Sequence, residues 1–227
     1  GEVDDSVNVL EIQNMAGNNK AEFKGDGTAR FGDILNGNFT EIEPDGTLRA
    51  NGLALTYRDE LPSYILPVAG APAPDSVSHK VGGVQRQFYS FDGAATVEIL
   101  SGSFEIPHDY AYGQPIELHI HWRPSTTGIG DVQWFFDWEY SPPQADPLPQ
   151  TTLNVVSQIT SNQIYRHKLT SFGYLPNLGF TLGGKIGCNL RRTPSGALDT
   201  YGADTLFEQI ALHIPCDTLG SRQIYSK

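Results

Sequence analysis

Two stretches of strictly alternating apolar and polar residues constrain the fold of this chain more than any other feature. From Ile116 to Trp122, and again from Val132 to Tyr140, every second residue is apolar. A period of two residues is typical of half-buried antiparallel strands. All three tryptophans of the chain occupy apolar positions of this pair of stretches, and side chains of that size bury more apolar area than any others. The pattern predicts that this face forms the core of a β-sandwich or barrel.

Similar alternation predicts further strands in the C-terminal two thirds of the chain. Eight strands at this spacing, separated by turns, favour a jelly-roll-like antiparallel β-sandwich over residues 85–227. The fold class predicted for the whole chain is therefore all-β. The expected strands are 85–91, 96–106, 115–123, 131–140, 152–159, 163–172, 185–191 and 206–214.

Residues 1–58 carry an internal repeat. Six residues between Asn19 and Arg30 recur nineteen positions later, between Asn38 and Arg49, and each copy centres on an Asp-Gly dipeptide. Such a dipeptide between short β-prone flanks predicts a hairpin. Two unrelated surface hairpins are the alternative interpretation, because short Asp-Gly turns are common.

A hairpin of this size cannot bury enough apolar area to be stable alone. We therefore expect residues 1–58 to be an assembly segment that packs on the same segment of neighbouring subunits or on a partner surface. The apolar residues expected at these contacts are Phe23, Phe31, Phe39, Ile42 and Leu48.

A stretch rich in proline and glycine, residues 59–84, follows the repeat. Because proline cannot donate a hydrogen bond to a strand ladder and favours stretched conformations, we predict an extended linker arm here. Its short apolar piece, Tyr64, Ile65 and Leu66, is predicted to anchor the arm on a neighbour. The predicted organisation is thus an assembly segment, a linker arm and a β-sandwich.

The charge balance and the apolar runs exclude two classes of partner. Fifteen basic and 26 acidic residues give a net charge of -11, so a phosphate-tracking surface for nucleic acid is not expected. No apolar run approaches the ~20 residues of a membrane helix, and we predict no membrane insertion. The acidic start of the chain is unlike a secretory signal. Gly1 would suit removal of an initiator methionine, and we expect a nearly complete gene product.

The two cysteines do not indicate a disulfide framework in a chain of this length. Cys188 alternates with Ile186 and Leu190, which favours a buried free thiol.

His119 and His121 are the sharpest candidates for a metal site. Two histidines at positions i and i+2 of a strand point the same way and can hold one ion. With Gly113 they resemble the opening of the cupin metal motif, but no glutamate follows at the expected distance and no later motif supplies a third histidine. A solvent-facing or interface pair is therefore favoured, and we predict no metal and no cofactor. In a homotrimer, symmetry is the remaining source of further ligands.

Asp137 and Glu139 are candidates for glycoside hydrolysis, which uses two carboxylates flanking the scissile bond. The preceding positions on the same face are Gln133 and Phe135, so the denser acidic array of jelly-roll glucanases is incomplete. A solvated strand face is the favoured interpretation. The chain also lacks a Gly-x-Ser-x-Gly nucleophile elbow and a phosphate loop, and we predict that it is not an enzyme.

Three tyrosines, Tyr110, Tyr112 and Tyr140, are weaker candidates for an exposed surface that stacks on sugars.

Two segments resemble a family of virion proteins of tailed bacteriophages. Residues 106–127 carry its Pro-His-x-x-x-x-x-Gly…His-x-His-Trp pattern, and residues 214–227 carry its Asp-Thr-x-Gly-Ser-Arg-x-x-Tyr ending. Residues 39–60 match it more loosely. The loop from Pro142 to Pro149 and the 59–84 arm have no counterpart in the pattern. The resemblance implies a structural component of the particle, and it provides no catalytic residues.

On this resemblance we expect a trimeric capsid decoration, or cement, protein, made in the host cytoplasm and located on the surface of the phage particle. Residues 1–84 would bind the major capsid protein, and the β-sandwich would form an outer knob. The alternative is a tail fibre, spike or needle-tip head that is held by a tail adaptor or nozzle protein and binds a host surface glycan. A particle-borne glycan hydrolase is the third interpretation.

Overall fold

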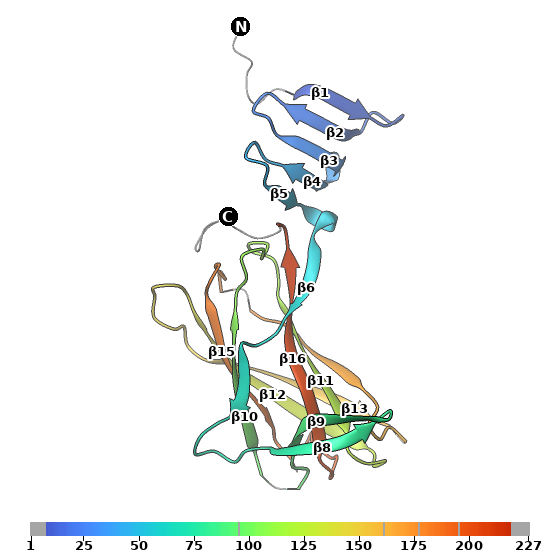
Figure 1. Ribbon diagram of the computed structural model, residues 1–227, viewed down its shortest axis with the longest axis vertical. Coiled ribbons are helices and arrows are strands. Elements are labelled where there is room, and N and C mark those ends of the chain that lie inside the picture. Colours follow the sequence, from blue (N-terminus) through green and yellow to red (C-terminus); the bar gives the residue numbers. More distant parts are fainter. Residues whose placement is uncertain (1–7, 95, 161, 177, 195, 219–227) are drawn as a thin grey trace. The chain divides into compact units, whose positions relative to one another are not determined.

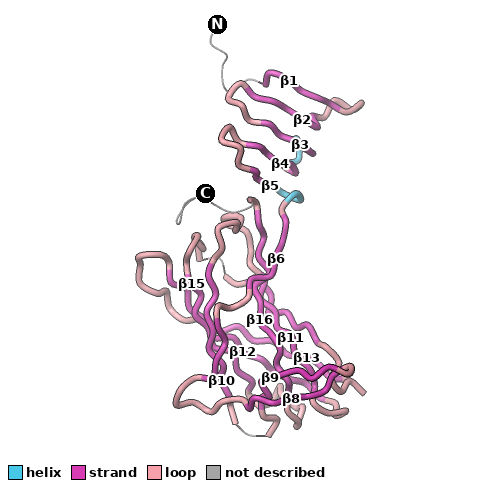
Figure 2. The backbone as a smooth tube through the Cα atoms, in the orientation of Figure 1, coloured by secondary structure: helices cyan, strands magenta, loops and turns pink. Residues whose placement is uncertain are grey.

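The computed structural model describes residues 8–218, except 95, 161, 177 and 195. Strands make up nearly all of the regular secondary structure in the described part, as Figure 2 shows, and this confirms the predicted all-β class. The strands are β1 Asn8–Gln13, β2 Asn19–Lys24, β3 Ala29–Asp33, β4 Asn38–Ile42, β5 Leu48–Ala50, β6 Thr56–Glu60, β7 Tyr64–Pro67, β8 Asp75–Val81, β9 Val84–Phe91, β10 Glu98–Glu105, β11 Glu117–Pro124, β12 Gly130–Ser141, β13 Thr151–Ile159, β14 Lys168–Tyr174, β15 Lys185–Arg192 and β16 Thr205–Cys216. Two short 3-10 helices, Ile34–Asn36 and Gly52–Ala54, complete the described elements.

The chain divides into two compact units. One consists of Gly1–Arg58 with Pro107–Gln114 and Ile214–Lys227, and the other of Asp59–Ile106 with Pro115–His213.

The first unit contains an N-terminal sheet in which β1 to β5 pair in sequence order (Figure 1). Both predicted Asp-Gly hairpins are present and have the same turn. In the β2–β3 turn Asp26 accepts a hydrogen bond from the Thr28 amide at 2.8 Å, and in the β4–β5 turn Asp45 accepts one from the Thr47 amide at 2.8 Å. The glycine after each aspartate has a positive φ, 93° and 86°, which suits glycine because it has no Cβ. The two copies of the repeat therefore have one local structure.

The N-terminal sheet lacks a core of its own among the described residues. Among those of its residues whose burial is described, the only buried ones are small or polar: Ala21, Glu22, Thr28 and Ala29.

The second unit is a sandwich of a five-stranded and a six-stranded sheet. The first sandwich sheet has the order β13-β12-β15-β10-β7, and the second has the order β14-β11-β16-β9-β8, with β6 also pairing with β16. From β9 to β16 every connection crosses between the sheets except the β12–β13 hairpin. The jelly-roll type stays a prediction, and this crossing pattern is one that a jelly roll requires.

Aromatic side chains from both sheets meet in the sandwich core. The rings of Trp122 in β11 and Trp134 in β12 lie 5.8 Å apart, and Phe91 in β9 lies 5.2 Å from Trp134. All three side chains are fully buried. The two alternating stretches thus supply the core, but β11 and β12 belong to different sheets and face each other across it. They do not form one paired face, because alternation fixes which side of a strand is buried and not which strand lies beside it.

The predicted linker arm, 59–84, contains two strands of the sandwich. β7 pairs with β10, and β8 pairs with β9. Tyr64, Ile65 and Leu66 are therefore hydrogen-bonded to the same chain. Both strands are the last in their sheets. Pro67 lies in β7, and an edge strand tolerates proline because one side of its backbone needs no partner.

The thiol of Cys188 is free and buried, as predicted.

Candidate functional site

The N-terminal sheet has one apolar face. Residues directly opposite each other in neighbouring strands point to the same side of a sheet, and the register pairs Leu10 with Phe23, Ala21 with Phe31, and Ile42 with Leu48. We call this side the apolar face. Its residues are Leu10, Ile12, Ala21, Phe23, Ala29, Phe31, Ile42 and Leu48.

Most of the large side chains of the apolar face are exposed, and Phe23 is half-buried. Leu10 and Ile12 each retain 53% of their accessible surface, and Phe31 retains 42%. Ile42 and Leu48 are also exposed. Scattered exposed apolar residues are ordinary, whereas larger contiguous apolar patches are typical of interaction surfaces.

The opposite face of the same sheet is charged. Glu11, Glu22, Arg30, Glu41 and Arg49 follow one another in the cross-strand register. Arg30 donates hydrogen bonds to Glu22, at 3.0 Å, and to Glu41. These contacts tie neighbouring strands together on the side that needs no apolar cover.

The predicted contact residues of the N-terminal segment divide between the two faces. Phe23, Phe31, Ile42 and Leu48 share the apolar face, whereas Phe39 lies opposite Gly32 on the charged face, with the Arg30 guanidinium 4.9 Å above its ring. In the sandwich, Tyr64 and Leu66 are exposed on β7, and Ile65 between them is half-buried. That these residues make assembly contacts stays a prediction.

The predicted histidine pair belongs to a longer histidine row on the outer surface of the second sandwich sheet. The ring of His119 lies 5.1 Å from that of His121 and 6.4 Å from that of His213. His121 Nδ1 lies 2.8 Å from Nε2 of His167. We define the histidine row as His213, His119, His121 and His167.

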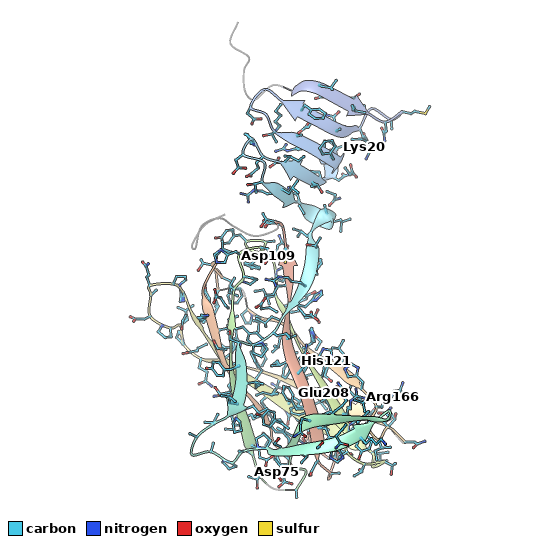
Figure 3. All side chains as sticks on the ribbon, viewed as in Figure 1. Lys20, Asp75, Asp109, His121, Arg166 and Glu208 are labelled. Atoms are coloured by element: carbon cyan, nitrogen blue, oxygen red, sulfur yellow. The ribbon has the colours of Figure 1, made fainter. Side chains whose placement is uncertain are left out.

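Two carboxylates flank the histidine row. Asp59 lies 2.9 Å from Nδ1 of His213. Glu208 sits where the β11–β16 register shifts, and its carboxylate approaches Arg86 at 2.8 Å and Arg123 at 3.1 Å. Figure 3 labels Glu208 and His121 on this surface. Sequence alone did not indicate the row, because His167 and His213 are far from the pair along the chain.

Burial lowers the pKa of both His119 and His121, so both rings are neutral near pH 7. Across the described residues, no three or more His, Cys, Asp or Glu side chains are arranged to hold a metal ion. The supply of further ligands by symmetry stays a prediction.

Asp137 and Glu139 both lie on the outer surface of the first sandwich sheet. Asp137 accepts hydrogen bonds from Arg191 Nε at 2.8 Å and from the Thr152 hydroxyl at 2.6 Å. Burial alone would raise the pKa of Asp137, but these two donors outweigh it and hold the pKa below its ordinary value. An ionised carboxylate that is already paired is suited to positioning neighbours and unsuited to donating a proton.

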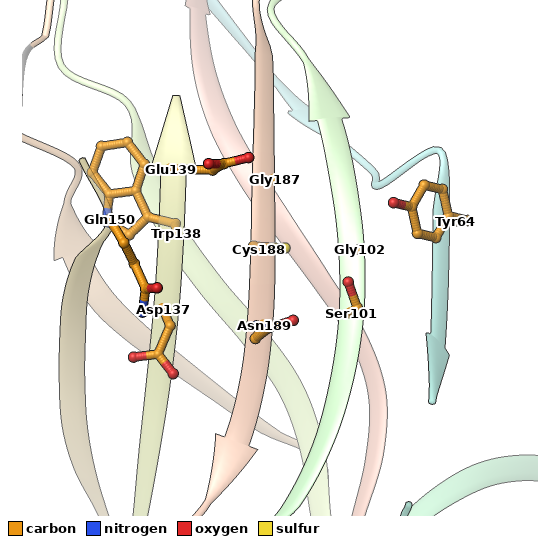
Figure 4. A pocket seen from close by; sticks show the side chains of 10 residues that line it. All are labelled: Tyr64, Ser101, Gly102, Asp137, Trp138, Glu139, Gln150, Gly187, Cys188 and Asn189. Atoms are coloured by element: carbon orange, nitrogen blue, oxygen red, sulfur yellow. The ribbon is translucent and has the colours of Figure 1, made fainter. Parts of the chain in front are cut away.

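A sheet groove of about 280 Å³ lies beside these carboxylates (Figure 4). Its polar side chains come from four strands and the loop before β13. They are Tyr64, Ser101, Asp137, Glu139, Gln150 and Asn189. Of these residues, only the two carboxylates and Tyr64 are candidates from the sequence. A polar residue that faces outward from a strand has no sequence pattern that distinguishes it.

Two of the three predicted sugar-stacking tyrosines are buried. Tyr110 and Tyr140 have no exposed surface, and their hydroxyls contact the Gln114 carbonyl at 2.6 Å and the Thr181 hydroxyl at 2.8 Å. That part of the prediction is wrong, since both rings are packing residues. Tyr112 is 48% exposed.

No described helix is long and apolar enough to cross a lipid bilayer.

No family model matches this chain, and no curated protein matches it either. Among solved structures, it is similar to an arabinose-bound α-L-arabinofuranosidase, with 11% identity over 71% of this chain and a TM-score of 0.36. It is also similar to a family 11 carbohydrate-binding module from Clostridium thermocellum, with 8% identity over 66% of this chain and 86% of that one and a TM-score of 0.35. A third is the enzymatically active domain of tailspike protein 4 from bacteriophage CBA120, with 10% identity over 72% of this chain and a TM-score of 0.29.

The chain spans 27% of the length of the arabinofuranosidase and 19% of that of the tailspike domain. At these scores we draw nothing about ligand or activity from the likenesses.

Proposed function

We propose that this chain is a structural protein of a tailed-phage virion that assembles through the apolar face of its N-terminal sheet. The observation that carries the proposal is that face itself. Five large apolar side chains remain exposed across a single-layer sheet, and burying such a contiguous surface is favourable by roughly 25 cal/mol for each Å² removed from water.

The proposed cover of the apolar face is the same face of other copies, three around a common axis. A ring of identical subunits closes without leaving an unpaired surface. The charge ladder of Glu22, Arg30 and Glu41 lies on the other side of each sheet, where its ion pairs already form within one subunit, so assembly through the apolar face leaves them in place.

The phage-like segments at residues 106–127 and 214–227 support placing this assembly in a virion. The first choice is a head decoration protein on the particle surface, held by the major capsid protein, with the sandwich displayed outward. A head decoration protein would be present in a copy number comparable to that of the capsid protein.

The test of assembly is the oligomeric state in solution. The unaltered chain is expected to sediment as a trimer at micromolar concentration, and the double variant Phe31→Glu, Ile42→Glu as a monomer with unchanged near-ultraviolet circular dichroism from its buried tryptophans. Leu35→Glu is the matched control, because Leu35 is 71% exposed but lies in a 3-10 turn outside the sheet. A monomeric unaltered chain, or a double variant that stays trimeric, would refute the proposal.

The sheet groove favours a second candidate, a tail fibre, spike or needle-tip head that binds a host glycan. A gel of purified particles separates the two locations. A copy number far below that of the major capsid protein would support the tail and exclude decoration of the head. Hydrolysis has less support, because Asp137 is engaged by Arg191 and Thr152.

A further inference from the structure

The outer surface of the first sandwich sheet gathers polar side chains from strands that are distant in sequence. The register places Asp137 opposite Asn189 and Asn189 opposite Ser101 in one row. The next row places Glu139 opposite Gly187. Figure 4 shows these side chains around the sheet groove, with Tyr64 at one end and Gln150 at the other.

Most of the polar atoms in the sheet groove are unengaged. Within the part of the chain that the structure describes, the side chains of Tyr64, Ser101, Glu139, Gln150 and Asn189 make no hydrogen bond or ion pair. The set offers hydroxyl, amide and carboxylate groups, which together both donate and accept hydrogen bonds. A few convergent polar groups in a concavity are what fix the orientation of a small ligand.

Two glycines shape the groove. A Cβ at Gly187 would lie 3.2 Å from Oε1 of Glu139, so a larger residue would displace that carboxylate. A Cβ at Gly102 would lie 2.9 Å from the Tyr64 carbonyl oxygen, so glycine permits β7 to approach β10 closely. That approach places the tyrosine ring, 49% exposed, at the side of the groove.

The charge of the groove excludes acidic ligands. Asp137 is neutralised by Arg191, whose guanidinium it binds at 2.8 Å, and Glu139 keeps an unpaired negative charge. A phosphate, sulfate or uronate would be repelled by that carboxylate. An uncharged ligand rich in hydroxyls suits the unengaged donors and acceptors, and the apolar face of a sugar ring suits an exposed tyrosine.

We propose that the sheet groove binds neutral saccharide, with Asn189, Ser101 and Glu139 contacting hydroxyls and Tyr64 stacking on one sugar ring. A volume of about 280 Å³ is near the lower end of the range of about 300–1,000 Å³ for ligand pockets. The site therefore takes one or two sugar units of a longer glycan. The inference depends on the sandwich alone, so it stands whether or not the N-terminal sheet assembles as proposed.

The first test uses the full chain, amide-resolved NMR and five free sugars: glucose, galactose, mannose, rhamnose and N-acetylglucosamine. At tens of millimolar, at least one sugar is expected to shift the side-chain amide signals of Asn189 and Gln150. Glucuronate is expected to leave them unchanged. No shift with any of the five sugars, or a shift with glucuronate alone, would overturn the proposal.

Variants then locate the site. Asn189→Ala is expected to weaken binding of the active sugar about tenfold, the effect of losing roughly 1.4 kcal/mol of hydrogen bonding. Tyr64→Ala tests the stacking contact. Asn154→Ala is the matched control, because Asn154 is exposed on β13 of the same sheet but does not line the groove. Equal affinities for Asn189→Ala and the unaltered chain would also overturn the proposal.

Discussion

Arg192 and Asp199 form a buried, two-pronged ion pair. Nε and Nη2 of the arginine lie 2.9 and 2.8 Å from the two carboxylate oxygens, and the side chains are 1% and 0% exposed. The same guanidinium donates to the carbonyl of Ala203 at 2.8 Å. The backbone N–H of Gln133 donates to Asp199 Oδ2 at 3.0 Å. The pair thus fastens the loop before β16 to β15 and β12.

Asp199→Asn is expected to destabilise the sandwich by about 3–5 kcal/mol, because it leaves the Arg192 charge buried without its partner. Urea denaturation followed by tryptophan fluorescence measures the change. Asp146→Asn, in an exposed loop, serves as the control and should stay within about 0.5 kcal/mol of the unaltered chain. Equal losses in the two variants would contradict the role given to the pair.

Stability is expected to fall between pH 7.5 and pH 5.5 because of the histidine row. Burial lowers the pKa of His119 and of His121 in the folded chain, so the unfolded chain takes up protons first as the pH drops. The contribution is complete above the ordinary histidine pKa of ~6.5 and is lost below it.

Unfolding free energies at the two pH values, measured in urea, give this slope. His121→Gln should reduce the dependence of the unfolding free energy on pH. The control is His79→Gln, at a histidine outside the row that contacts Tyr165, and it should leave the dependence caused by the row unchanged. A slope unaffected by His121→Gln would show that the row does not cause it.

The repeat turns depend on glycine. Gly46 has a φ of 86° with open space around it, so Gly46→Ala meets backbone strain alone and should destabilise the N-terminal sheet by about 1 kcal/mol. Hydrogen exchange of the β4–β5 amides measures this. Gly202→Ala is the control, since Gly202 has open space and no positive φ. Unchanged exchange in Gly46→Ala would contradict the turn geometry.

Cys188 should resist thiol reagents. Burial raises its pKa to about 12, and the thiolate is the reactive form. At pH 8 the rate of its labelling by a disulfide reagent, read by mass spectrometry of the Cys188 peptide, should equal the rate of unfolding and rise with urea. Immediate labelling in the absence of urea would contradict this burial.

Periodicity in the sequence predicts which side of each strand is buried, but it does not predict which strands pair with one another. Trp122 and Trp134 were correctly placed in the core, yet β11 and β12 lie in opposite sheets, because pairing depends on the path of the whole chain. The prolines of residues 59–84 predict a linker arm, whereas the structure has the edge strands β7 and β8 there, and only Pro67 of these prolines lies within a strand. In the repeat, Phe23 and Ile42 share the apolar face because nineteen residues return the chain to an equivalent strand position.

The histidine row and the sheet groove both bring together residues that are far apart in the sequence. His119 and His121 are visible in the sequence as a pair, but His213 in β16 and His167, just before β14, lie beside them only in the folded chain. Asn189 and Ser101 had no distinguishing pattern, and the sheet groove exists because the register of β10, β12 and β15 aligns them with Asp137.

The repeated hairpin makes the N-terminal sheet modular. Each copy contributes two strands with the same sidedness, so inserting one more copy of nineteen residues would lengthen the sheet by about 10 Å, at the usual spacing of ~4.8 Å between strands. Apolar and charged sides would both continue without interruption. Duplication or deletion of one copy would therefore change the width of the N-terminal sheet in fixed steps, with no change to the sequence of the sandwich.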